Sequence, residues 1–248
     1  MAIESRGNTQ RKVAFSPGLG EARAESAPVS GEPAAPAVDR PVCADTAGEY
    51  PYEIVISPGA PARERVLKAA YNLFLRHGVV KVGIDEIVEE AGCARASLYT
   101  HFGSKQALAL AAMELHYDRW VERWLKPGIE QSGDTPEARI MGVLALFDQW
   151  FHYRETFLTC FYVRVMFETS PGDPVREAAV HHLSSIGDTV SGLAEEAHFE
   201  NPDGFARLFQ VVMAGSIVAA TAGNRNAANE VHGVVSDIVR RWPRRAAS

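Results

Sequence analysis

Residues 91–105 read Ala-Gly-Cys-Ala-Arg-Ala-Ser-Leu-Tyr-Thr-His-Phe-Gly-Ser-Lys, and this stretch decides the fold of the 248-residue chain. Gly92 separates two short predicted helices, one over about residues 84–91 and one over about residues 94–101. Two short helices joined by a glycine-containing turn, after a longer helix, form the helix-turn-helix pattern. In that arrangement the second short helix can enter the major groove of DNA while its neighbours contact the backbone. The stretch therefore predicts a DNA-binding unit.

Longer helices flank this pair on both sides. The preceding helix, over about residues 61–77, carries apolar residues at steps of three and four, namely Val66, Ala69, Ala70, Leu73 and Phe74. Gly78 follows it, where a left-handed C-cap residue belongs. After the pair, Ser104 is the predicted N-cap of a long helix that reaches about Trp124 and is closed by Lys126-Pro127-Gly128.

The rest of the chain predicts further long helices. Helix breakers occur at residues 133–136, 171–174, 201–204 and 223–226, and neither an alternating strand pattern nor an internal repeat appears. The fold class is therefore all-α, with nine or so helices. An N-terminal three-helix helix-turn-helix domain is expected at residues 61–105. A larger C-terminal helical domain for ligand binding and dimerisation is expected at residues 106–242, and a tail at residues 243–248.

The first 60 residues differ from the rest in composition. They hold seven of the fourteen prolines and a single leucine, with eight acidic against five basic residues. Such a segment buries too little apolar surface to offset its conformational entropy, so we expect residues 1–60 to be mostly disordered. The patch at residues 50–56, Tyr-Pro-Tyr-Glu-Ile-Val-Ile, either docks on the folded part or is a sticky piece of linker, and linker is the favoured interpretation.

Composition also excludes several classes of protein. Apolar residues make up 46% of the chain, yet no apolar run approaches the ~18 residues of a membrane span. The three cysteines, Cys43, Cys93 and Cys160, are scattered, which excludes a disulfide scaffold and favours the cytoplasm. We find no His-Glu-x-x-His, no phosphate-binding loop and no Cys-x-x-Cys. We therefore expect no enzyme, no catalytic residue, no metal site and no cofactor.

The charge distribution supports DNA binding only weakly. The net charge is −6, but residues 61–119 carry eight basic and seven acidic residues, whereas residues 120–248 carry twelve basic and sixteen acidic residues. The relatively basic part coincides with the predicted DNA-binding unit, and the acidic bulk should face away from phosphate.

Residues 62–118 resemble the TetR family of bacterial transcriptional regulators. The match rests on the order and spacing of Ala69-Ala70, Leu73-Phe74, Gly78, Ile84, Ile87, Ala91-Gly92, Leu98-Tyr99-Thr100-His101-Phe102, Ser104-Lys105 and Leu108. The resemblance implies a ligand-responsive regulator, more often a repressor, that binds a double-stranded DNA operator as a homodimer. It places Tyr99, His101 and Lys105 where the family grips phosphates. It places Arg95, Ser97 and Thr100 where the family reads bases or sugar-phosphate.

The chain departs from the family pattern at four positions. Val82 and Gly83 replace the usual threonine or serine at the start of the first short helix. Ala94 replaces the serine that caps the second short helix, and Ala96 replaces a glycine. A lost cap costs about 1 kcal/mol. The alternative function is therefore a helical adaptor or ligand-binding protein whose specific DNA binding is weak or lost.

A dimer surface is expected on the last two helices, because helix-turn-helix proteins usually bind two half-sites. Two wide apolar stripes occur there, and either they pair with a second copy or they face only their own core. The residues predicted to form the interface are Phe205, Phe209, Val212, Ile217, Val231, Val235 and Ile238.

An effector pocket is expected in the aromatic-rich middle of the chain, because ligand sites are mostly apolar with a few polar groups. The alternative is that these aromatic residues are simply core. The candidate lining residues are Trp120, Trp124, Phe147, Trp150, Phe151, Phe161, Arg164 and His181. Such walls suit a small apolar or aromatic effector, with Arg164 as the central cation for a charged one. The identity of the effector, the operator sequence, the target genes and the sign of regulation are not readable from the sequence.

Overall fold

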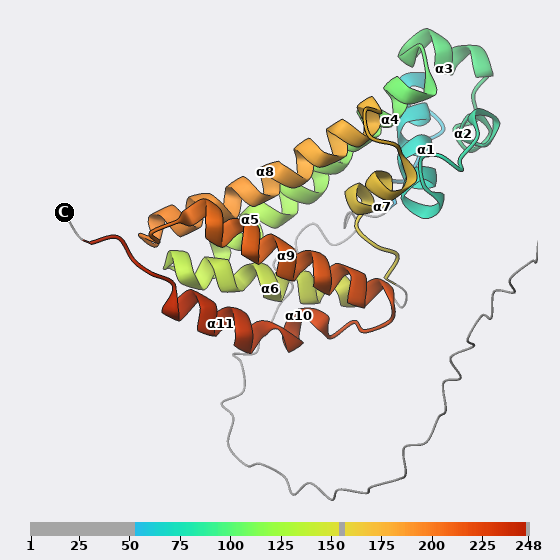
Figure 1. Ribbon diagram of the computed structural model, residues 1–248. Helices are drawn as coiled ribbons and strands as arrows, with labels where there is room; N and C mark the ends of the chain where they lie inside the picture. The colour runs from blue at the N-terminus through green and yellow to red at the C-terminus, as the bar shows by residue number, and fades with distance from the viewer. Residues whose placement is uncertain (1–52, 154–156, 247–248) are drawn as a thin grey trace, which may run out of the picture. The chain divides into compact units, whose positions relative to one another are not determined.

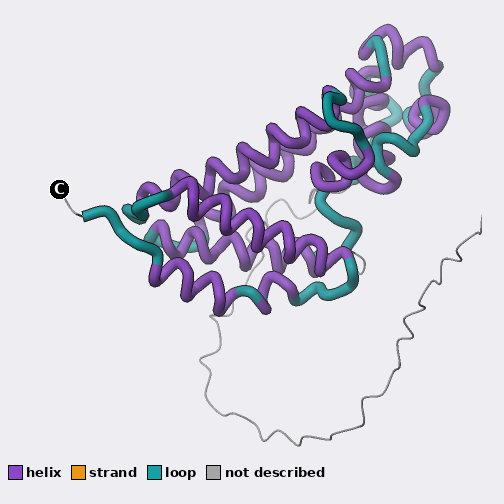
Figure 2. The backbone as a smooth tube through the Cα atoms, viewed as in Figure 1, coloured by secondary structure: helices purple, strands orange, loops and turns teal. Residues whose placement is uncertain are grey.

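The first helices follow the pattern that the sequence predicts. A computed structural model describes residues 53–153 and 157–246, and these described residues contain helices and loops but no strand (Figure 2). Helix α1 spans Ala62–His77, α2 spans Ile84–Glu90 and α3 spans Arg95–Phe102. Gly78 and Gly92 have φ of 89° and 58°, so each turn requires the backbone freedom of glycine. The predicted bounds of these helices are met within one residue.

The long helix after α3 is less regular than the sequence predicts. Helix α4 spans Lys105–Tyr117 and begins at Ser104, whose side chain accepts a hydrogen bond from the Ala107 amide. A π-helix, η2, follows over Asp118–Leu125, and α5 continues over Lys126–Gln131. The prediction that Lys126-Pro127-Gly128 closes the helix is wrong. Pro127 lies in the first turn of α5, where a proline amide is not required for helix hydrogen bonding.

The second half of the described chain contains α6 (Pro136–His152), α7 (Phe161–Glu168), α8 (Pro174–Glu196), α9 (Pro202–Thr221), α10 (Ala227–Glu230) and α11 (His232–Arg241). Helix α8 runs beside both α4 and α9, and α10 and α11 pack on α6 (Figure 1). The described residues thus form eleven α-helices and one π-helix, against the nine or so predicted. The break between α6 and α7 was not foreseen, because no glycine or proline marks it.

Helix α9 departs from the expectation about membrane spans. Among the described residues it is the one helix with the length and apolar composition to cross a membrane. Its apolar residues are interrupted by single polar ones, so no uninterrupted run marks it in the sequence. One face of α9 is buried against the rest of the chain, with Phe205, Phe209, Met213 and Ile217 at most 6% exposed. A helix that is buried along one face in this way is also typical of the core of soluble proteins.

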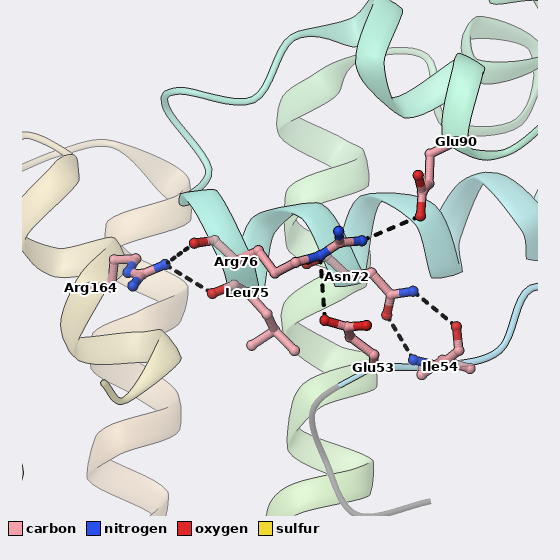
Figure 3. A network of polar contacts seen from close by, with 7 residues as sticks. All are labelled: Glu53, Ile54, Asn72, Leu75, Arg76, Glu90 and Arg164. Atoms are coloured by element: carbon pink, nitrogen blue, oxygen red, sulfur yellow. Dashed lines mark hydrogen bonds and ion pairs between the residues drawn. The ribbon is translucent and has the colours of Figure 1, made fainter. Parts of the chain in front are cut away.

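The residues just before α1 are docked on it, which corrects the favoured linker interpretation for this part of the patch. Ile54 is 6% exposed, and its amide and carbonyl both pair with the buried Asn72 side chain at 2.8 and 2.9 Å (Figure 3). Glu53 lies 3.5 Å from Arg76. The buried Asn72 side chain thus satisfies both backbone polar groups of Ile54 and holds this residue against α1. The prediction of disorder covers residues 1–60, of which residues 1–52 lie outside the described residues.

Candidate nucleic-acid interface and effector region

Helix α3 presents a polar outer face. Leu98 is fully buried and anchors the helix, whereas Tyr99, Thr100 and His101 are exposed on the other side. Tyr99 is 44% exposed, unusual for an aromatic side chain whose ring could have packed inward. The phenol of Tyr99 and the imidazole of His101 can donate hydrogen bonds to phosphate oxygens. The hydroxyl of Thr100 donates to the carbonyl of Ala96 at 2.9 Å. Three of the six predicted DNA-binding side chains are therefore exposed on α3.

Arg95 begins α3 and is already paired within the chain. Its Nη1 lies 3.1 Å from Oδ1 of Asp85 on α2, and both side chains are more than half exposed. An exposed pair of this kind contributes little to stability, so phosphate can compete for the guanidinium. Ser97 is only half-buried, one turn from the helix start. Ala94 precedes α3 without any side-chain cap, as the sequence predicts.

The N-terminus of α2 is capped differently from the family pattern, which has threonine or serine there. Gly83 is the N-cap, and its amide donates to Oε2 of Glu86 at 2.6 Å. Val82 is 1% exposed and belongs to the core. The missing hydroxyl at residues 82 and 83 therefore removes a phosphate donor, but it does not leave the start of α2 unformed.

Lys105 lies at the first turn of α4 and contacts the loop between α1 and α2. Its Nζ donates to the carbonyl of Val80 at 3.2 Å, and the amide of Val80 donates to Oε2 of Glu168 at 3.3 Å. Partial burial lowers the pKa of Lys105, and the negative charge of Glu168 works against that shift. Lys105, which is predicted to bind phosphate, is thus linked through the backbone of Val80 to Glu168 on α7.

Two arginines that support the DNA-binding unit escaped the sequence reasoning. Nη1 of Arg65 on α1 donates to the carbonyls of Ala91 and Gly92, both at 3.0 Å, and so holds the turn between α2 and α3. The guanidinium of Arg63 lies 5.2 Å above the ring of Phe102 at the end of α3. The contacts of Arg65 join residues 26 and 27 positions apart, and a single sequence gives no signal for such a pairing.

Arg164 does not serve the aromatic region for which it was predicted. Its Nη1 donates to the carbonyls of Leu75 and Arg76 at 2.9 and 3.1 Å, at the C-terminal end of α1 (Figure 3). A cation at this place satisfies helix carbonyls that lack intrahelical partners and suits the helix dipole. Helix α7 therefore joins the DNA-binding unit through Arg164 and Glu168, and the role of central cation for an effector is wrong.

The predicted effector residues on η2, α6 and α7 form one buried aromatic cluster. Neighbouring rings on η2, α6 and the loop before α7 lie 4.8 to 6.0 Å apart, from Phe151 and Phe157 (4.8 Å) to Phe147 and Phe151 (6.0 Å). Phe161 reaches this group through the ring of His116, which lies 5.1 Å from Phe161 and 6.3 Å from Trp120. The members, each at most 6% exposed, are Trp120, Trp124, Phe147, Trp150, Phe151, Phe157 and Phe161. We call them the aromatic cluster. Phe157 is a member that the sequence reasoning did not name.

His181 is wrongly predicted as a lining residue. It is exposed on α8, whereas the adjacent His182 is buried and lies 3.3 Å from Glu114. Neighbouring residues on a helix point about 100° apart, so a choice between two adjacent histidines decides which one is inside. Burial lowers the pKa of His182, although Glu114 opposes the shift.

A second buried histidine connects the cluster with α1. His116 on α4 lies between Trp120, Phe161 and Tyr162, and its Nδ1 lies 3.3 Å from the hydroxyl of Tyr71 on α1. Burial lowers the pKa of His116 to about 3, with smaller contributions from His182 and Arg119, so its ring is neutral at physiological pH. A neutral imidazole inside an aromatic environment is a polar group that neither residue spacing nor motif indicates.

A cavity of about 240 Å³ lies elsewhere, at the ends of α5, α6 and α8. It is lined by Lys126, Ile129, Glu130, Arg139, Asp188, Thr189, Gly192, Leu193 and Glu196. Arg139 is 3.8 Å from Glu196, and Lys126 pairs with Glu122, so its principal cations already have acidic neighbours. The described residues contain no group of three histidine, cysteine or acidic side chains that could hold a metal ion.

Most residues predicted for the dimer interface belong to the chain's own core. Phe205, Phe209, Ile217 and Val235 are 1 to 6% exposed, and Val212, Val231 and Ile238 are half-buried against them. Another face of α9 is exposed instead, with Leu208, Val211 and Val218 at 39, 69 and 59%. Together with Gly215 and Ala222 these residues repeat at steps of three and four, and we call them the outer stripe of α9. The apolar surface of α9 is therefore wider than the part that is buried within the single chain.

The chain is similar to known regulatory proteins. Residues 66–112 match the family model described as "Bacterial regulatory proteins, tetR family". The chain is similar to the HTH-type transcriptional activator FasR of Mycolicibacterium smegmatis, 28% identical over 134 residues, 54% of this chain and 61% of FasR. It is 44% identical over 50 residues to the HTH-type regulator Rv1255c of Mycobacterium tuberculosis, 20% of this chain and 25% of that protein. The chain thus spans less than two thirds of these curated relatives.

The fold is also found among solved structures. SCO4454, a TetR-family transcriptional regulator from Streptomyces coelicolor, aligns with a TM-score of 0.66 and 24% identity, over 73% of this chain and 95% of that one. The likeness therefore extends over both the helix-turn-helix unit and the helices that follow it. The relatives are named as transcriptional regulators rather than enzymes, which agrees with the sequence prediction.

Proposed function

The chain belongs to the TetR family of bacterial regulatory proteins, and on that premise we propose that it is a dimeric, cytoplasmic transcriptional regulator that leaves a palindromic operator when a small apolar or aromatic effector binds. The observation that carries the proposal is the exposure of three polar side chains of α3, Tyr99, Thr100 and His101, on a helix that the fully buried Leu98 anchors to the core. A short helix with a polar outer face and a rigid inner one is what major-groove binding requires.

The DNA contacts follow from the placement of each side chain. Tyr99, His101 and Lys105 would position the protein by binding phosphate oxygens, and Arg95, Ser97 and Thr100 would read bases or sugar-phosphate. For Arg95 this requires that the pair with Asp85, both more than half exposed, opens on binding. Asp85 would then lie near the DNA as a negative charge, which disfavours other alignments of the protein along the DNA.

Dimerisation places two such helices on one operator. The outer stripe of α9 is the surface we assign to the second copy, because five small or aliphatic residues follow the three-four spacing of a helix pair there. Gly215 has no neighbouring atom within 4 Å of an added Cβ, so nothing in its own chain fills the space beside it. A two-fold interface buries the same stripe from both copies.

Release would depend on coupling between the aromatic cluster and the DNA-binding unit. Trp120 and Lys105 lie on one continuous helical segment, and Arg164 and Glu168 of α7 bond to the end of α1 and the loop after it. An effector that favours one arrangement of these helices changes operator affinity by its differential affinity for the two arrangements. We propose that the chain is a repressor, with the ligand-free form bound to the operator. FasR is named an activator, so the likeness alone does not decide it.

Selection of bound fragments from a genomic DNA pool tests the proposed function. The purified chain is expected to enrich a pseudo-palindrome whose half-sites are about one helical turn apart, with affinity that falls steeply as salt rises. Enrichment of no common sequence, at low and at moderate salt, would instead favour the helical adaptor that has lost specific DNA binding.

A further inference from the structure

The aromatic cluster contains two polar groups that its packing leaves without partners. The indole N–H groups of Trp120 and Trp150 are buried, and neither has a hydrogen-bond acceptor within reach among the described residues. Both side chains are 3% exposed, and their rings lie 4.9 Å apart. A buried indole N–H normally finds a partner, because leaving it unpaired costs about 1–3 kcal/mol. Trp242, outside the cluster, has the third such indole among the described residues, but only Trp120 and Trp150 carry theirs on neighbouring rings.

The backbone around these donors also departs from regular structure. Trp120 lies in η2, and a π-helical segment inside a longer helix frequently marks a functional site. On the other side of the cluster, Phe157 comes from the loop before α7 rather than from a helix. Its ring meets those of Trp150 and Phe151 at 5.0 and 4.8 Å. Thr159 in the same loop has φ 148°, a strained value for a β-branched residue.

The neighbouring charges indicate which ligands are excluded. Arg164 is bonded to the end of α1, and Nε of Arg225 donates to the carbonyl of Phe151 at 2.8 Å. Arg119, the residue before Trp120, is hydrogen-bonded to Tyr71. Each of these cations is therefore already engaged. An anion would lack a counter-charge and pay the cost of burial. An organic cation would meet the positive edges of two N–H donors.

We propose that the aromatic cluster binds an uncharged, planar aromatic molecule whose carbonyl or other acceptor oxygen accepts hydrogen bonds from the indoles of Trp120 and Trp150, and whose ring takes the place of Phe157. The ligand's acceptor satisfies the two donors, and its ring restores the edge-to-face contacts that the Phe157 ring makes now. This assignment names the ligand class of the effector site and rests on the proposed function only for its effect on DNA binding.

A matched pair of small probes tests the assignment without DNA. 1-Indanone and indane share a planar bicyclic carbon frame, but only 1-indanone carries an acceptor oxygen. In a titration of uniformly ¹⁵N-labelled full-length protein, 1-indanone should move the indole proton resonances of Trp120 and Trp150 downfield. The resonance of Trp242, whose ring packs on Phe199 and Phe205 outside the aromatic cluster, is the internal reference, and single tryptophan-to-phenylalanine variants assign all four indoles. A shift of only one of the two predicted indoles would contradict the proposal that both donate to the same acceptor.

Affinities from the same titrations give the second readout. The wild type should bind 1-indanone on the order of tenfold tighter than indane, the ratio that one net hydrogen bond supports. Trp150→Phe should remove this preference, so that the variant binds 1-indanone and indane with equal affinity. Phe157→Leu, which keeps an apolar side chain but opens the ring position, should bind 1-indanone several-fold tighter than the wild type.

Three outcomes would overturn the assignment. These are equal binding of indane and 1-indanone, the absence of any shift of either predicted indole at millimolar 1-indanone, and an unchanged affinity in Phe157→Leu. Each is independent of operator binding. If the chain binds 1-indanone as described but does not bind DNA, only the proposed function is contradicted. If it binds its operator but fails these tests, only the ligand class is contradicted.

Discussion

Replacement of Tyr99 and Lys105 together by alanine is expected to lower operator affinity by a hundredfold or more while the chain stays folded. Each side chain would donate to a phosphate, and a hydrogen bond to a charged group contributes about 1.5–3 kcal/mol, so two losses exceed ~3 kcal/mol. Fluorescence anisotropy with a labelled operator duplex measures the change. Because Lys105 is the only formal charge lost, the slope of log affinity against log salt should fall by about one.

A matched variant separates the DNA face from general effects of the substitutions. Tyr153 and Arg123 also present an exposed ring and an exposed cation, but they lie in the C-terminal part, and their double alanine variant should bind the operator like the wild type. Arg95→Ala should weaken the operator more than a scrambled duplex, since Arg95 is assigned to base reading. Unchanged binding by a folded Tyr99→Ala, Lys105→Ala protein would mean that α3 is not the DNA face.

The second large effect concerns assembly. Val211→Glu combined with Val218→Glu is expected to convert the dimer into monomers at micromolar concentration. In a two-fold interface each introduced carboxylate is buried near its own symmetry mate or its partner, and burial of unpaired like charges costs several kcal/mol. Both valines are more than half exposed in the single chain, so the substitutions should leave its fold intact. Sedimentation velocity gives the mass, and operator affinity should fall together with it.

The control for this variant is Val55→Glu. Val55 is 81% exposed and lies before α1, far along the chain from α9. It introduces the same charge in place of the same side chain, and the dimer should persist. If the double α9 variant also remains dimeric, the outer stripe of α9 is not the interface, whatever the mass of the wild type.

The local part of the fold was predictable because its signals are local. Gly78, Gly92 and Ser104 mark helix ends within a few residues of the turns they form, and the structure places the helices there. The exposure of Tyr99 follows from the same spacing, because buried Leu98 fixes which side of α3 faces inward. No comparable local signal marks η2, whose Trp120 ring packs against Phe147 and Trp150 of α6.

The errors come from features that one sequence cannot resolve. The apolar stripe of α9 is wider than its buried face, so Phe205 and Val211 are equally plausible interface residues until the inner half is known. Arg164 bonds to carbonyls 88 and 89 positions away, where only the tertiary fold brings α7 to α1. The choice of His181 over His182 depended on a rotation of α8 that the sequence leaves open.

The central claim is that two α3 helices, held at a fixed separation by a dimer, bind two half-sites on one face of DNA. The most direct measurement is the affinity of the wild type for its selected pseudo-palindrome, compared with the same duplex carrying five extra base pairs between the half-sites. About half a helical turn then separates their faces, since one turn is about 10–10.5 base pairs. The account predicts a loss of affinity of a hundredfold or more, toward the level of a single half-site. Equal affinity for the two duplexes would contradict it.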